Sequence, residues 1–134
     1  MEMVNCDFEN FGCQGGYLIN TIDYLQIEGL VSDQCVPYAS RPSRCDYRCS
    51  GNGTPERYYC KKHSMKALTT NEEIMSELEL NGPMMMGLMI YEDFLNYESG
   101  IYKHVAGEQV GGHAMKLIGY GFDDQEGLFW LLQN

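Results

Sequence analysis

The stretch "GGHAMKLIGYG", Gly111 to Gly121, is the segment that says most about the fold of this chain. Two glycines precede a histidine, and apolar and polar residues then alternate with the period of a half-buried strand. Glycine lets another backbone approach closely, and a histidine at the start of a strand is placed to exchange protons near neutral pH. Taken alone, His113 is more often a core residue than a catalytic one, so its meaning depends on the rest of the chain.

A second strand is expected where the chain ends, in "LFWLLQN", and the polar turn "FDDQEG" joins it to the first. The final residue of this strand is Asn134. An amide side chain can orient an imidazole by accepting its N–H, which selects the tautomer. If the two strands pair as a hairpin, Asn134 comes close to His113.

The remaining pattern separates helix and loop from strand. Apolar spacing predicts a helix over residues 17–28 that stops at Gly29. A second helix begins at Thr70, whose capping-box partner is Glu73, and ends at Gly82 and Pro83. Further strands are expected at 84–91 and 99–105, and residues 31–62 are expected to form a long, covalently stapled loop. The sequence thus predicts an α+β fold with a helical lobe at 1–62 and a β-rich lobe at 63–134.

Composition excludes several classes of partner. The chain has 19 acidic and 9 basic residues and a formal charge of −10, which argues against nucleic acid and anionic membranes. We find no apolar run long enough to span a bilayer. A local cluster of bases is expected to be a solvated loop; its members are Arg57, Lys61, Lys62 and Lys66.

Cysteine usage indicates an oxidising compartment, because five of the six cysteines lie between Cys6 and Cys49. The triplet "NGT" at Asn52 is a glycosylation acceptor sequence that fits the same compartment. The first ten residues, "MEMVNCDFEN", have neither the basic start nor the apolar stretch of a signal peptide. We therefore expect the chain to be incomplete.

Two motifs keep alternative interpretations. "GCQGG", residues 12–16, is either a tight turn or a stretch of exposed backbone that bonds an extended peptide as a strand would. Disulfides are favoured over zinc for the cysteines, and no metal or other cofactor is expected. The spacing of a zinc site is nevertheless permissible for Cys45, Cys49, Cys60 and His63.

Together these pieces resemble the papain-like cysteine peptidases, and within them the cathepsin B-like subgroup. The matching segments run in the family's order: "GCQGGYLINTIDYLQIEGLVSDQCVPY", then "NGPMMMGLMIYEDFLNYESGIYKHVAGEQVGGHAMKLIGYG", then "FWLLQN". The resemblance implies a two-lobed fold, helical in one lobe and barrel-like in the other, truncated here at both ends. It also implies a cysteine-type endopeptidase that uses Cys, His and Asn.

The resemblance assigns roles to individual residues. His113 matches the catalytic base and acid, and Asn134 matches the residue that orients it. The family's substrate-contacting positions, including those of its second specificity pocket, are matched by Gly15, Gly16, Leu18, Gly87, Gly112 and Ala114.

The nucleophile is the main departure from the family pattern. Its motif, C-G-[SA]-C-[WY], does not occur in the chain. The family places the histidine roughly 130 to 150 residues after that cysteine, which from His113 falls before residue 1. The nucleophile and the oxyanion-hole glutamine are therefore expected outside this chain, and the chain by itself is expected to be inactive.

For the cysteines, the resemblance implies the pairs Cys6–Cys45 and Cys35–Cys49. Cys13 matches a structural cysteine whose partner would lie outside the chain, so we expect it unpaired, while Cys60 has no clear counterpart. In the cathepsin B-like subgroup, a loop with paired histidines binds the substrate's C-terminal carboxylate. That loop is missing here, because only "ASRPSR" separates Tyr38 from Cys45. This absence predicts cleavage within chains rather than removal of C-terminal dipeptides.

The resemblance further implies polypeptide substrates, protein inhibitors of cysteine peptidases as additional partners, and a lysosomal, vacuolar or secreted location. Two alternatives stay open at this point. One is a non-catalytic papain-fold protein that binds peptides or matrix partners, although such a protein has no need of His113 and Asn134. The other is a small zinc-binding domain.

Overall fold

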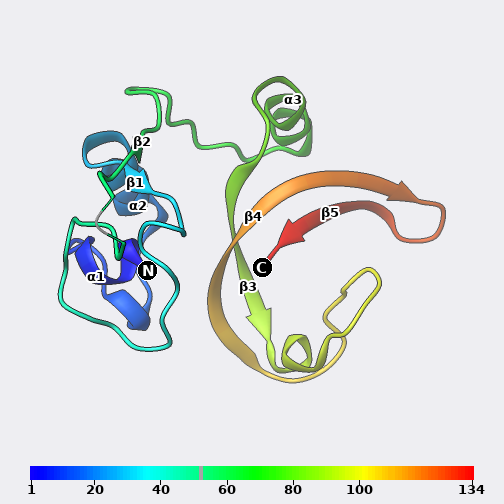
Figure 1. Cartoon of the computed structure of the whole chain (residues 1–134). Coiled ribbons are helices and arrows are strands. Elements are labelled where there is room, and N and C mark those ends of the chain that lie inside the picture. Colours follow the sequence, from blue (N-terminus) through cyan, green and yellow to red (C-terminus); the bar gives the residue numbers. More distant parts are fainter. Residues whose placement is uncertain (52) are drawn as a thin grey trace. The chain divides into compact units, whose positions relative to one another are not determined.

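The structure is a computed structural model that describes residues 1–51 and 53–134. The glycosylation acceptor expected at Asn52 lies outside the described residues. The chain consists of two compact units, Met1–Lys66 and Ala67–Asn134 (Figure 1). Helices and antiparallel strands are both present, as expected for the α+β class, and the strands of the described residues form no closed barrel. Across the described residues, we find no helix with the length and apolarity needed to cross a bilayer.

The first unit is built around short elements. The predicted helix is α2, which follows Tyr17 and ends before Gly29. Gly29 has a φ of +69°, and a Cβ there would lie 2.9 Å from the carbonyl oxygen of Tyr58, so only glycine fits. The elements are α1 (Glu2–Cys6), the 3₁₀ turn η1 (Gly12–Gln14), α2 (Leu18–Ile27), β1 (Leu30–Val31) and β2 (Arg57–Tyr58).

Two disulfides hold the long loop of this unit, as the stapled-loop prediction required. Cys6 is bonded to Cys45, and Cys35 to Cys49, which are the pairs that the family resemblance implies. Cys6 and Cys35 are buried. The bridges therefore replace part of the apolar core that so short a unit cannot supply.

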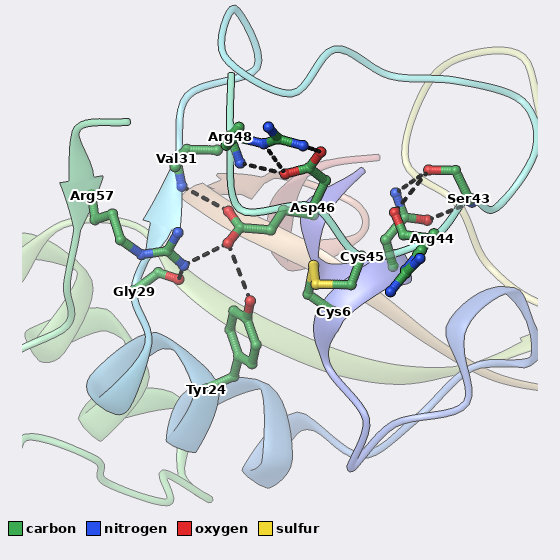
Figure 2. The surroundings of a disulfide bond; sticks show 12 residues. Cys6, Tyr24, Gly29, Val31, Ser43, Arg44, Cys45, Asp46, Arg48 and Arg57 are labelled. Atoms are coloured by element: carbon green, nitrogen blue, oxygen red, sulfur yellow. Dashed lines mark hydrogen bonds and ion pairs between the residues drawn. A yellow bond between two sulfur atoms is a disulfide. The ribbon is translucent and has the colours of Figure 1, made fainter. Parts of the chain in front are cut away.

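A buried carboxylate organises the centre of the unit. Glu2 is 4% exposed and accepts hydrogen bonds from the Tyr24 hydroxyl and the Val31 amide. Arg57 reaches it from β2 with an Nη2–Oε1 distance of 2.5 Å. Figure 2 shows Tyr24, Val31 and Arg57 pointing toward this common partner. The expectation that Arg57 belongs to a solvated loop is wrong, because its guanidinium neutralises a buried acid.

The second unit begins with the helix α3 (Asn71–Asn81), which has the predicted capping box. The Thr70 side chain accepts from the Glu73 amide, and the Glu73 carboxylate accepts from the Thr70 amide. Gly82, at a φ of +86°, ends the helix. The remaining elements are β3 (Met84–Tyr91), the 3₁₀ turn η2 (Glu92–Asn96), β4 (Gln109–Asp123) and β5 (Gly127–Gln133).

The three strands form an antiparallel sheet of order β3–β4–β5. β4 is long and strongly curved (Figure 1). Its register slips against β5 between Leu117 and Gly119, and such an extra residue bends a strand. One face of the sheet carries the core of this unit, which is formed by Leu117, Met115 and, from α3, Leu78.

The strand predicted at 99–105 is wrong. These residues form an irregular loop between η2 and β4. At the end of this segment the Val105 amide, followed by that of Ala106, donates to the carboxylate of Asp93 and not to a neighbouring strand. A side-chain acceptor thus replaces the ladder that a strand would need.

Candidate active site

His113 and Asn134 meet in the second unit. The Nε2 atom of His113 lies 2.8 Å from the Oδ1 atom of Asn134, although 21 positions separate them. The imidazole is half-buried and the amide is exposed. Because an amide oxygen only accepts, Nε2 is the protonated ring nitrogen. In the neutral imidazole the proton-accepting lone pair is therefore on Nδ1.

The β4–β5 hairpin produces this meeting. Lys116 pairs with Gln133, which brings the end of β5 alongside the middle of β4, three residues after His113. Strand alternation places His113 on the same face as Met115 and Leu117, the buried residues of β4. A packed face below the imidazole and a hydrogen bond at its outer edge define where the ring lies.

The sequence did not predict the aromatic group beside the imidazole. The ring of Phe94, in η2, has its centroid 6.4 Å from that of His113, at an interplanar angle of 56°. Tyr102 meets Phe94 edge-on at 5.0 Å, and Tyr97 lies parallel to Phe94 at 6.0 Å. The available signal was the run of aromatic residues between the two strands, but nothing in their spacing links them to His113.

Two of the small residues assigned to substrate contact face one another. Gly87 of β3 pairs with Ala114 of β4, and both are exposed. They lie on the sheet face opposite to His113, together with Gly112. On β3 the same face carries exposed Met85 and Met89, one on each side of Gly87. Two small residues therefore lie between two exposed thioether side chains on this face.

The other assigned residues, Gly15, Gly16 and Leu18, belong to the first unit. Gly15 has a φ of +97°, and both its amide and its carbonyl are used inside the turn, with Gly12 and Phe11. A Cβ on Gly16 would lie 2.2 Å from Oδ1 of Asn10, the atom that accepts the Tyr17 amide. The turn interpretation of "GCQGG" therefore explains both glycines. It leaves the backbone-binding interpretation open for Gly16.

Asn10 ties this turn to the rest of the first unit. Its Nδ2 donates to the buried carboxylate of Asp7 at 2.7 Å and to Oγ1 of Thr21 at 3.2 Å. Leu18 starts α2 directly after the turn and is half-buried. The position of Gly16 is thus set by a polar network that no sequence motif indicates.

The cysteine geometry answers the zinc question. Cys45 and Cys49 are both in disulfides, so their sulfur atoms are not available as thiolate ligands. The zinc-domain alternative is therefore wrong for these residues. Cys13 and Cys60 are free and exposed. None of the six cysteines belongs to the unit that contains His113.

The chain is similar to known proteins over nearly its whole length. The model of the papain family cysteine proteases matches residues 1–134. The chain is 33% identical to cathepsin B-like CP2 of Giardia intestinalis over 98% of its own length and 45% of that protein. It is 36% identical to cathepsin B of Dictyostelium discoideum over 90% of its length and 44% of that protein.

The fold is shared with a solved structure of procathepsin B S9 from Trypanosoma congolense. That comparison has a TM-score of 0.77 at 24% identity and covers 99% of this chain and 53% of the other. The chain thus spans less than half the length of the two curated relatives. With a family match over its whole length and cathepsin B-like relatives above 30% identity, the chain belongs to the papain family of cysteine proteases, in its cathepsin B-like branch.

Proposed function

We propose that this chain carries the histidine and asparagine of a cysteine endopeptidase whose nucleophile lies outside these 134 residues. The observation that carries the proposal is the 2.8 Å hydrogen bond between Nε2 of His113 and Oδ1 of Asn134. It leaves Nδ1 as the base and holds the ring through an uncharged partner. A peptide-binding protein without catalysis has no use for this pair.

The chemistry follows from that tautomer. Nδ1 of His113 takes the proton of a cysteine thiol, and the resulting thiolate attacks the carbonyl carbon of the scissile peptide bond. The imidazolium then gives the proton to the leaving amine, and a thioester remains. Nδ1 next removes a proton from water, whose oxygen attacks the thioester and releases the acid and the thiolate. Throughout, Asn134 keeps the ring aligned.

Substrate contacts are assigned to both units, which we propose to be the two lobes of one peptidase domain. Gly16 is the position for strand-like hydrogen bonds to an extended polypeptide, with Gly15 and Leu18 beside it. An apolar substrate side chain is assigned to the Gly87–Ala114 pair, because both residues are small and the exposed Met85 and Met89 flank Gly87. Gly112 directly precedes His113 in β4, and its backbone is assigned to the region of the scissile bond.

Endopeptidase activity is favoured by the short segment before Cys45. It contains no histidine that would bind a substrate's terminal carboxylate. Peptides with free and with amidated C-termini should therefore be cut at similar rates. Efficient release of dipeptides from the free form alone would contradict this part of the proposal.

The first experiment is to sequence the transcript that contains these 134 codons and to look upstream for a Cys-Gly-Ser-Cys-Trp motif. The encoded protein is then assayed with a fluorogenic dipeptidyl amide. His113→Asn should lower kcat by roughly 10²–10⁴-fold. The matched control His63→Asn replaces an exposed histidine at a φ of +59°, a conformation that asparagine tolerates, and should leave activity unchanged.

Full activity in His113→Asn would overturn the proposal. Peptide binding without hydrolysis, from a transcript that lacks the cysteine motif, would instead favour the non-catalytic binding protein. Polypeptides, as substrates and as inhibitors of cysteine peptidases, are the expected partners. The expected location is lysosomal, vacuolar or secreted, which localisation of the tagged full-length protein tests.

A further inference from the structure

Asp93, a residue outside the proposed catalytic pair, anchors the loop that precedes β4. Its carboxylate accepts the Tyr102 hydroxyl at Oδ1, and the amides of Val105 and Ala106 at Oδ2, at 2.7 and 3.1 Å. Nδ1 of His104 lies 3.2 Å from each oxygen. One side chain therefore holds a loop whose backbone is not paired with a neighbouring strand.

These donors favour the charged form of the acid. The Tyr102 hydroxyl and then the Val105 amide hold the pKa of Asp93 well below its usual range. Burial and the same hydrogen bond raise the pKa of Tyr102 to about 12. The Tyr102–Asp93 bond thus persists across the whole pH range in which a peptidase works.

The anchor leads directly to the aromatic residues beside His113. Tyr102 is held by Asp93 and packs edge-on against Phe94, which directly follows Asp93 in η2. Phe94 in turn lies within the range of ring contacts from His113. A continuous chain of contacts therefore runs from Asp93 through Tyr102 and Phe94 to the imidazole.

The imidazole needs this second support. The hydrogen bond to Asn134 holds one ring atom, Nε2, which lies closer to the axis of the Cβ–Cγ bond than Nδ1 does. Rotation about that bond moves Nδ1 further than Nε2, so the bond to Asn134 by itself leaves Nδ1 some freedom. A packed ring at the flank blocks the rotation, and Phe94 is the ring in that place.

We infer that Asp93 is a positioning residue for His113, acting through Tyr102 and Phe94 to hold Nδ1 where the proton is transferred. The catalytic meaning of this inference rests on the proposed function. The structural part of the inference, the coupling of Asp93 to the imidazole, does not depend on the proposed function.

The test is nitrogen NMR of the histidine side chains in the ¹⁵N-labelled chain. In the unmodified chain His113 should show a single tautomer, protonated at Nε2. Asp93→Asn and Tyr102→Phe should draw its two nitrogen resonances together, because the ring then samples both tautomers. The matched control Tyr97→Phe keeps its ring and removes only a hydroxyl bonded to the Gly100 carbonyl, and should leave His113 unchanged.

The loop amides report whether the anchor has been released. If the Val105 and Ala106 signals move in Asp93→Asn while His113 keeps one tautomer, the inference is overturned. It is also overturned if Tyr97→Phe disturbs His113 as much as Tyr102→Phe does.

A second measurement uses the full-length protein and covers the case in which a variant of the shorter chain does not fold. There Asp93→Asn should lower kcat on the order of tenfold to a hundredfold with KM unchanged, and an unchanged kcat would overturn the inference. A full-length protein without any peptidase activity would defeat the proposed function. The structural coupling between Asp93 and the imidazole of His113 would still be tested separately by the NMR experiment.

Discussion

Glu2 and Arg57 form an ion pair across 55 positions of sequence, with an Nη2–Oε1 distance of 2.5 Å. Burial by itself lowers the pKa of Arg57, but the hydrogen bond and charge of Glu2 outweigh it and the pKa is raised. Burial, and then the charge of Glu2, raise the pKa of Tyr24. The group behaves as one buried unit whose charges balance.

Removing one partner should therefore strongly destabilise the first unit. Arg57→Ala leaves an uncompensated buried carboxylate, and we expect a loss of about 3–5 kcal/mol. The matched control is Arg48→Ala, which breaks a solvent-exposed pair with Asp46 and should change nothing measurable. Hydrogen exchange of amides in residues 1–66 measures both effects. Equal protection in the two variants would show that the buried pair does not stabilise the unit.

The disulfides can be mapped directly. Digestion of the unreduced chain should yield peptides joined through Cys6–Cys45 and Cys35–Cys49, while Cys13 and Cys60 react with an alkylating agent before reduction. With sequence separations of 39 and 14, the bridges should contribute about 4 and about 3 kcal/mol. Recovery of a Cys13–Cys60 peptide would contradict the expected pattern.

Leu117 is the side chain on which the core of the second unit most depends, because it is 0% exposed. Leu117→Ala should lower the free energy of unfolding by about 2–5 kcal/mol. Leu131→Ala, on the neighbouring strand and 53% exposed, makes the same chemical change and should cost less than about 0.5 kcal/mol. Urea denaturation followed by the fluorescence of Trp130 compares them. Similar midpoints for the two variants would show that the sheet has no buried face.

Acid should release the Asp93 anchor. The folded pKa of Asp93 lies below its usual value near 3.9, so its contribution to stability is complete above about pH 4 and is lost as the pH falls through the folded pKa. Asp93→Asn should remove this part of the acid dependence. Asp124→Asn, in the exposed turn between β4 and β5, should not. Thermal melts between pH 2 and pH 7 show the difference, and parallel pH profiles for all three proteins would rule the anchor out.

Local structure was predictable where neighbours in sequence make the contacts. The capping box of α3 needs only Thr70 and Glu73, three positions apart, and its end needs only Gly82. The hairpin that joins His113 to Asn134 followed from an alternating segment, a polar turn and an apolar segment. These features were read correctly because strand period and cap chemistry act over a few residues.

Distant partners were not predictable in the same way. Arg57 looked like one base among several, and its burial depends on an acid at the other end of the unit. Residues 99–105 have strand-like composition, yet the amides of Val105 and the following Ala106 donate to the Asp93 carboxylate and not to a neighbouring strand. In both cases a long-range polar contact overrode a local tendency.

The sequence by itself determined the family, the elements α2, α3, β3 and the β4–β5 hairpin, and through that hairpin the approach of Asn134 to His113, since each depends on residue type, order and short spacing. Only the tertiary structure decided that Gly87 faces Ala114, that Glu2 is neutralised by Arg57, and that Phe94 lies against His113. The physical reason is that strand register, burial and ring packing are settled by contacts between residues far apart in the chain, and no local pattern encodes them.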